Sequence, residues 1–253
     1  MPLNDKIRNI SLMQLVILII LSYFALLFLK SVNIPIDNYW IYFIVILFFI
    51  YKLKDCKQEF VDDARHVFDK FSFKHILVIV MANIFFSYGM LYLANYLITI
   101  PQFKQFITFD LISKTSLVIG GGYFAKVLIS PISEELIFRG VILNKLRLFV
   151  PLTFAVAASS LLFGSFHHYG SIVSAIVFAV CMCILYLKTE NILVPIFAHF
   201  LNNLFAETIY TFDYNSLLFT NGLVVNAVSV LAVISLVYLI SFILKELNSI
   251  KYA

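Results

Sequence analysis

Residues 130–140 read SPISEELIFRG, and they lie inside an apolar run that extends from about residue 116 to residue 143. The stretch places three ionisable side chains, Glu134, Glu135 and Arg139, among apolar neighbours. At the centre of a lipid bilayer, a charged side chain costs about 3 kcal/mol by insertion scales and more by simulation. Intramembrane charges of this kind mark functional positions, so we expect partners for them elsewhere in the chain.

The composition indicates that lipid is the main solvent of this chain. Of its 253 residues, 62% are hydrophobic and 13% are charged, and the mean hydropathy is +0.98. An ordinary soluble domain has about a quarter of its residues charged. Several apolar runs reach about 18 residues or more, which is enough to cross a hydrocarbon core of about 30 Å as a helix. We therefore expect an all-α polytopic membrane protein.

Eight apolar runs predict about eight transmembrane helices. They cover residues 12–29, 39–51, 75–100, 116–143, 151–168, 171–187, 192–209 and 222–244. The first run is too long for the apolar part of a signal peptide and is interpreted as a retained span. Residues 100–114 and 207–221 are predicted to be short outer loops.

The positive charges predict the orientation of these helices. If the spans alternate from an inside N-terminus, 13 lysines and arginines lie inside and 3 lie outside. Such a bias predicts a protein of the cell membrane that has both termini in the cytosol. The inside group is Lys6, Arg8, Lys52, Lys54, Lys57, Arg65, Lys70, Lys74, Lys145, Arg147, Lys188, Lys245 and Lys251. The cations form no basic stripe, so the net charge of +4 does not indicate a nucleic-acid partner.

A polar stretch at about residues 54–74 separates the second and third runs. Apolar side chains recur in it at helical spacing: Phe60, Val61, Ala64, Val67, Phe68 and Phe71. This pattern predicts an amphipathic helix on the inner membrane surface. A helix that docks a partner protein is the alternative.

Helical spacing separates the two glutamates of the 130–140 stretch. Glu135 and Arg139 are four residues apart and share a face, whereas Glu134 points about 100° away. Pro131 suits a first helical turn that Ser130 or Ser133 caps, which would place both acids near a positive helix end. We expect Arg139 to hold Glu135, and Glu134 to be available as a general base. A purely structural ion pair is the alternative.

Two further apolar runs carry polar side chains within motifs of the same spacing. Phe163 and His167 are four residues apart, as are His199 and Asn203. Polar side chains that lie together in lipid need a partner or water. Hydrogen bonds that only join helices are one explanation. Three helices that each bring polar side chains into the membrane favour a shared functional site.

The chemistry that these residue types fit best is amide hydrolysis. Glu134 with His167 could activate a water, and His199 with Asn203 could donate to the carbonyl oxygen. Alternatively, Glu134, His167 and His199 could hold a zinc ion that lowers the pKa of its bound water. The zinc-protease motif HExxH is absent, and no pair of intramembrane aspartates is present. The rings of Phe138 and Phe163 are candidates for substrate contact.

The motifs EExxxR at Glu134–Arg139, FxxxH at Phe163–His167 and HxxxN at His199–Asn203 resemble the CPBP family. This family comprises CAAX-processing and bacteriocin-processing intramembrane proteases and is also called the Abi family. The resemblance implies an intramembrane endopeptidase whose catalytic residues are Glu134, Glu135, Arg139, His167, His199 and Asn203. Its substrate would be a membrane-associated protein or peptide, which in eukaryotic relatives is a prenylated CAAX protein. A zinc cofactor and a metal-free glutamate mechanism both remain open.

The resemblance also divides the chain. We expect N-terminal membrane helices over residues 1–114, which include the amphipathic segment, a catalytic core of helices four to seven over residues 115–210, and a C-terminal membrane helix over residues 211–253. A catalytically silent immunity or scaffold protein of the same family is one alternative, and a transporter is another. Upright helices would place His199 about 10 Å and His167 about 24 Å from the inner membrane surface. Straight helices would therefore hold the two histidines apart.

Overall fold

The structure is a computed structural model that describes residues 3–100, 121–167, 171–213 and 216–251. In these ranges every regular element is a helix. In chain order the elements are α1 (Leu3–Arg8), α2 (Leu12–Ser31), α3 (Tyr39–Lys52), α4 (Lys57–Arg65), α5 (Phe73–Thr99), α7 (Gly121–Phe124), η1 (Ala125–Ile129), α8 (Ser130–Glu135), η2 (Leu136–Leu143), α9 (Asn144–Leu146), α10 (Leu152–Ser165), α11 (Ile172–Thr189), α12 (Leu193–Phe212), α13 (Leu217–Thr220) and α14 (Gly222–Lys251).

The predicted all-α membrane fold is confirmed. Within the described part of the chain, four helices, α2, α5, α11 and α14, are long and apolar enough to cross a membrane, and α3 and α10 are shorter apolar helices. Each of the eight predicted ranges contains helix, although residues 116–120 and 168 lie outside the described residues. Nearly all of the predicted loop at residues 100–114 also lies outside the described residues.

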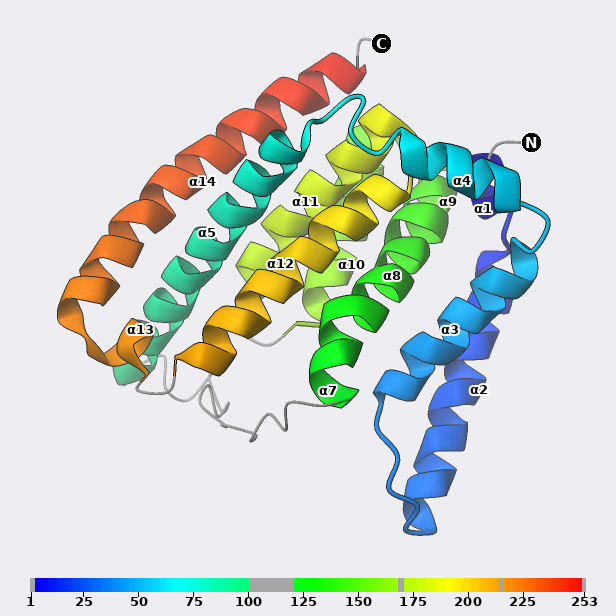
Figure 1. Cartoon of the computed structure of the whole chain (residues 1–253), viewed down its shortest axis with the longest axis horizontal. Coiled ribbons are helices and arrows are strands. Elements are labelled where there is room, and N and C mark those ends of the chain that lie inside the picture. The colour runs from blue at the N-terminus through cyan, green and yellow to red at the C-terminus, as the bar shows by residue number, and fades with distance from the viewer. Residues whose placement is uncertain (1–2, 101–120, 168–170, 214–215, 252–253) are drawn as a thin grey trace.

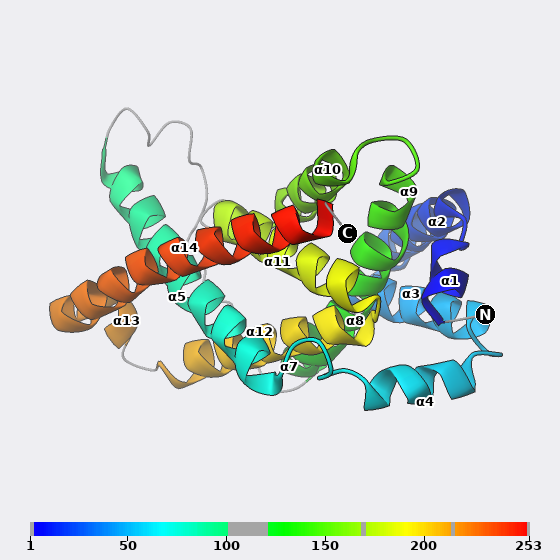
Figure 2. The same cartoon turned by 90° about the horizontal axis from the view of Figure 1, so that it is seen from above.

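Helix α11 lies at the centre of the bundle, with α10, α5, α12 and α14 around it (Figures 1 and 2). Its residues 181–186 are completely buried, including Cys181, Cys183 and Tyr186. The α2–α3 hairpin lies on the far side of α8 from α14 (Figure 1). The helices between 121 and 212 therefore occupy the interior of the protein, where polar side chains can meet away from lipid.

The stretch from η1 to η2 is one helical segment with two π-helical parts. Proline lacks an amide hydrogen, and its ring clashes with the carbonyl group four residues earlier. A wider π turn before Pro131 relieves this clash without ending the helix. Ser130 is helical, with φ −59° and ψ −51°, and no side chain caps the start of α8. The prediction that a helix begins at Pro131 with a serine cap is therefore wrong.

The amphipathic segment is shorter than predicted. Helix α4 ends at Arg65, so Val67, Phe68 and Phe71 follow it in a turn region. The Nδ2 atom of Asn191, which precedes α12, donates to the backbone oxygen of Asp63 at 2.7 Å and attaches α4 to the bundle. Burial raises the pKa of the Asp63 carboxyl group.

The predicted loop at 207–221 is also partly wrong. Helix α12 continues to Phe212, and α13 occupies Leu217–Thr220. Polar contacts between α12 and the segment that precedes α8 account for the extra helical turn: Tyr123 Oη lies 2.9 Å from Thr208 Oγ1, and Lys126 pairs with Glu207.

Helices α5 and α14 pack closely at a pair of small residues. A Cβ atom placed on Gly89 would lie 2.5 Å from the Cβ atom of Ala232. In lipid, helices associate through such close packing, because the apolar tails give them no hydrophobic driving force.

Substitution of Gly89 by alanine should lower the free energy of unfolding in detergent by about 1–3 kcal/mol, because the backbones of α5 and α14 must separate. Thermal unfolding of the purified protein measures this loss. The second substitution Ala232→Gly should restore most of it. Gly122→Ala is the matched control, since an added Cβ there meets nothing within 4 Å. Equal effects of Gly89→Ala and Gly122→Ala would contradict the packing argument.

Candidate active site

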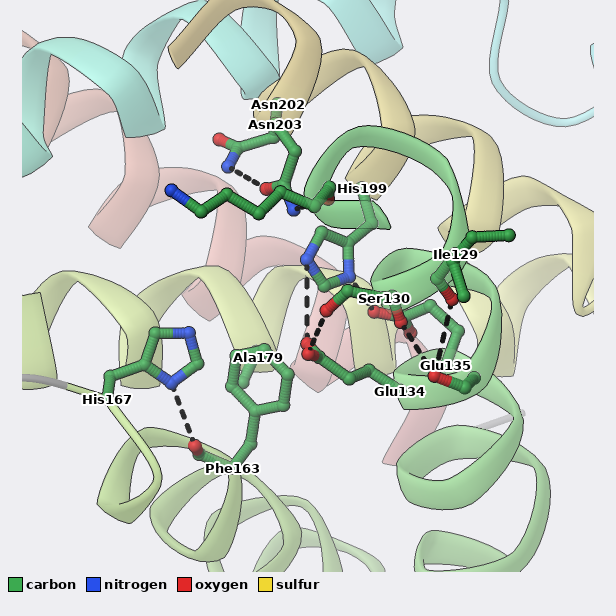
Figure 3. A network of polar contacts seen from close by, with 12 residues as sticks. Ile129, Ser130, Glu134, Glu135, Phe163, His167, Ala179, His199, Asn202 and Asn203 are labelled. Carbon is green, nitrogen blue, oxygen red and sulfur yellow. Dashed lines mark hydrogen bonds and ion pairs between the residues drawn. The ribbon is translucent and has the colours of Figure 1, made fainter. Parts of the chain in front are cut away.

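The polar side chains of three helical stretches converge beside α11 (Figure 3). The α8–η2 stretch provides Glu134, Glu135 and Arg139, α12 provides His199 and Asn203, and His167 lies two residues after the end of α10. The structure brings His199 to both glutamates and places His167 against the ring of Phe163. The joint action of Glu134 and His167 on a water stays a prediction.

Glu135 and Arg139 form the buried ion pair that their spacing predicts. Arg139 Nη1 donates to Glu135 Oε1 at 3.0 Å, and the two side chains are 1% and 0% exposed. Arg139 Nη2 also donates to the backbone oxygen of Ala179 on α11 at 3.0 Å. The guanidinium carbon lies 4.8 Å from the centre of the Phe163 ring. Arg139 therefore joins η2, α10 and α11 while it neutralises Glu135.

His199 lies between the two carboxylates. Its Nδ1 atom donates to Glu135 Oε1 at 2.7 Å, and its Nε2 atom lies 3.8 Å from Glu134 Oε2. An ionised carboxylate only accepts hydrogen bonds, so Glu135 fixes the proton of a neutral His199 on Nδ1. The Nε2 atom then faces Glu134. The ring is held in place by Phe178, with ring centres 5.0 Å apart.

Glu134 differs from Glu135 in its surroundings. Its side chain is 15% exposed, whereas that of Glu135 is fully buried. The hydroxyl group of Ser130 donates to Glu134 Oε1, and the phenol of Tyr42 on α3 interacts with the same carboxylate. Of the two acids, Glu134 is the one that can reach a water molecule or a substrate.

His167 and His199 lie on two sides of one aromatic ring. The ring centre of Phe163 is 4.7 Å from that of His167 and 5.9 Å from that of His199. His167 Nδ1 contacts the backbone oxygen of Phe163 at 3.1 Å. Both histidine rings therefore lie against the same side chain, which straight and upright helices would not allow.

Asn203 belongs to a chain of side-chain amides. Its Nδ2 atom donates to the backbone oxygen of Lys126 at 2.9 Å, and its Oδ1 atom accepts from Asn202 Nδ2 at 3.2 Å. Asn202 in turn accepts from Asn83 on α5 at 3.0 Å. These contacts fix the amide of Asn203, and one of its two N–H groups is the donor to Lys126.

Several members of the site were not predicted from the sequence. Asn202 stands beside a predicted residue, and Asn83 is a polar residue inside an apolar run, so both carried a recognisable signal. No such signal marked Tyr42, Phe178 or the contact of Ser130 with Glu134, because aromatic and small residues are common in any membrane helix. Phe138 and Phe163 are buried against each other, with ring centres 5.1 Å apart, and their role in substrate contact stays a prediction.

The arrangement does not fit a zinc centre. Zinc holds nitrogen and oxygen ligands at about 2.0–2.2 Å, so three or four donor atoms must converge on one point. Among the described residues, no group of three His, Cys, Asp or Glu side chains is placed to do this. The Nδ1 atom of His199 is directed at Glu135, and that of His167 at a backbone oxygen.

An apolar groove lies beside the site, between the turn after α4 and the helices that carry Glu134 and His199. Its volume is about 380 Å³. The lining side chains are Ala64, Val67, Phe68, Leu128, Ile132, Leu193, Ile196, Phe197 and Phe200. Ile132 precedes Glu134 by two residues and Ile196 precedes His199 by three, so the groove runs along the helices of the site.

Fold and site together define a polytopic helical membrane protein with a buried centre of glutamate, histidine and arginine. Residues 117–205 match the family described as Rce1-like, type II CAAX prenyl endopeptidase. The match contains all three motifs and confirms the predicted resemblance to the CPBP family. It indicates a protease. A search of curated proteins and a search of solved structures each found no match.

Replacement of Arg139 by methionine should lower the free energy of unfolding by about 3–5 kcal/mol, because it leaves the Glu135 carboxylate buried without a counter-charge. Thermal unfolding in detergent measures the effect. The double variant Glu135→Gln, Arg139→Met should be more stable than Arg139→Met alone. Arg147→Met, at an exposed arginine, is the control and should change little. Additive effects of the two substitutions at 135 and 139 would show that the pair is not coupled.

Proposed function

We propose that the protein is an intramembrane endopeptidase in which Glu134 activates the water that hydrolyses a peptide bond. The observation that carries this proposal is the contact of Glu134 with His199, whose other nitrogen is held by the Glu135–Arg139 pair. A carboxylate that is accessible, hydrogen-bonded and adjacent to an oriented imidazole is suited to general-base catalysis. The family match supports the same reaction class.

The reaction would begin with a water molecule beside Glu134 Oε2 and His199 Nε2. Glu134 takes one proton from the water, while the oxygen of that water forms a bond to the carbonyl carbon of the substrate. The resulting oxyanion can accept a hydrogen bond from the second N–H of Asn203. Glu134 then returns the proton to the leaving nitrogen as the carbon–nitrogen bond breaks. Glu135 and Arg139 hold His199 in one orientation throughout.

The substrate would be a membrane-associated protein or peptide, because the site lies among apolar helices. The groove beside the site is large enough for an alkyl or prenyl chain, and its lining is apolar. An attached lipid chain in this groove would place the neighbouring peptide bonds close to Glu134. A prenylated substrate of the CAAX type is consistent with this geometry.

The orientation in the cell membrane follows the predicted charge bias. Helix α1 and the C-terminal end of α14 lie at the same end of the bundle (Figure 1). We propose that this end faces the cytosol, with α4 at the inner membrane surface. The apolar groove would then open near the layer in which lipid-modified chain ends are anchored.

Glu134→Gln should reduce the rate of peptide cleavage by about 10²–10⁴-fold, because the amide cannot accept the proton of water. The assay compares purified wild type and variant on farnesylated and unmodified peptides, with and without a chelator. Asp37→Asn removes a carboxylate from an exposed turn and is the matched control. Full activity of Glu134→Gln would end the proposal. If the chelator stops cleavage by both proteins and the substitution does not, this result would favour a metal mechanism.

Ala64→Trp should fill the apolar groove and raise the KM for a lipid-modified peptide, because the chain would lose its binding volume. The kcat for an unmodified peptide should stay the same. Val61→Trp, one turn earlier on α4 and outside the lining, is the matched control. Steady-state kinetics with both peptides provide the measurement. An equal rise in KM for both peptides would exclude the groove as the site of the lipid chain.

A further inference from the structure

A second ion pair lies on the same two helical segments as the catalytic candidates. Lys126 on η1 and Glu207 on α12 approach to 3.3 Å between Nζ and Oε2. Their side chains are 36% and 22% exposed, so both are more accessible than the Glu135–Arg139 pair. The mechanism proposed above does not use either residue.

The ion pair is not needed to join the two helices. The Tyr123 hydroxyl lies 2.9 Å from that of Thr208, and Asn203 donates to the backbone oxygen of Lys126 at 2.9 Å. These two neutral contacts already join α12 to α7 and to η1 without the lysine ammonium. A charged residue inside an apolar segment is costly, and positions of this kind are usually retained for substrate or ion contact.

The distance from this ion pair to the site corresponds to a short piece of peptide. Glu207 follows His199 by eight residues on the regular helix α12, which is about 12 Å along the axis. Lys126 precedes Glu134 by the same number of residues on the facing segment. An extended peptide covers about 3.3–3.6 Å per residue, so three to four residues bridge the two places.

We propose that Lys126 binds the free C-terminal carboxylate of the substrate and so sets the distance between the chain end and the cleaved bond. The inference rests on the proposed endopeptidase function and specifies its substrate. A lysine ammonium has three donors, and the contact with Glu207 uses one of them. Glu207 holds the ammonium at its position along α12, and among the described residues the other two donors have no partner, so they can bind a carboxylate. Such a charge-assisted hydrogen bond is stronger than one between neutral groups.

The experiment compares peptides that end in a carboxylate with the same peptides ending in an amide, with two, three, four or six residues after the cleaved bond. Wild type should cleave the carboxylate forms with three or four residues at least tenfold faster, as kcat/KM. Lys126→Met should lose this preference and cleave the amide forms at the wild-type rate. Lys126→Arg should retain the preference, since it keeps the cation.

The double variant Lys126→Met, Glu207→Gln removes both charges and should behave as Lys126→Met, which guards against misfolding from an unpaired Glu207. Equal wild-type rates on carboxylate and amide peptides would overturn this inference and leave the proposed function standing. An equal loss of activity of Lys126→Met on the carboxylate and the amide peptides would also overturn this inference, because it would indicate that the ion pair is structural. Absence of cleavage of every peptide by wild type would overturn the proposed function itself.

Discussion

The structure depends on one interaction, the buried contact between Arg139 and Glu135. Both side chains are withdrawn from lipid and water, and a lone charge there would be very costly. The arginine meets this cost with contacts to Glu135, to the Ala179 oxygen and to the Phe163 ring. Because these partners belong to α8, α11 and α10, and Arg139 itself to η2, the same contacts that neutralise the charge also position these helices. His199 is oriented by the carboxylate that this arrangement fixes.

Local spacing predicted the parts of the site that lie within one helix. The Glu135–Arg139 pair follows from four-residue spacing, and it is confirmed. The prediction that His167 and His199 both meet the glutamates followed from the cost of polar groups in lipid, which requires partners without saying which ones. The partner of each histidine could not be predicted, since it depends on how α10 and α12 are inclined. His199 therefore contacts both glutamates, although the sequence paired Glu134 with His167.

The fold was predictable because apolar runs are long and polar boundaries are clear. The errors lie where a polar residue stabilises helix beyond such a boundary, or where a helix changes its pitch. Pro131 indicated a helix start by its usual preference, but π-helical turns on both sides keep the segment continuous. Residues 207–212 were predicted to be part of a loop, yet contacts of Glu207 with η1 and of Thr208 with α7 keep them in α12. These contacts join residues more than 80 positions apart.

The continuous segment from η1 to η2 has a consequence for the site as a whole. If a helix began at Pro131, its free amide groups would supply the positive potential that holds the glutamates. Since the segment is helical on both sides of Pro131, that potential is not available at Glu134 and Glu135. Side chains must supply it, and they do so unequally: Arg139 forms an ion pair with Glu135, whereas Glu134 receives donors from Ser130 and Tyr42 and lies 3.8 Å from His199 Nε2. This difference suits Glu135 for holding His199 in place and leaves Glu134 as the carboxylate that water can reach.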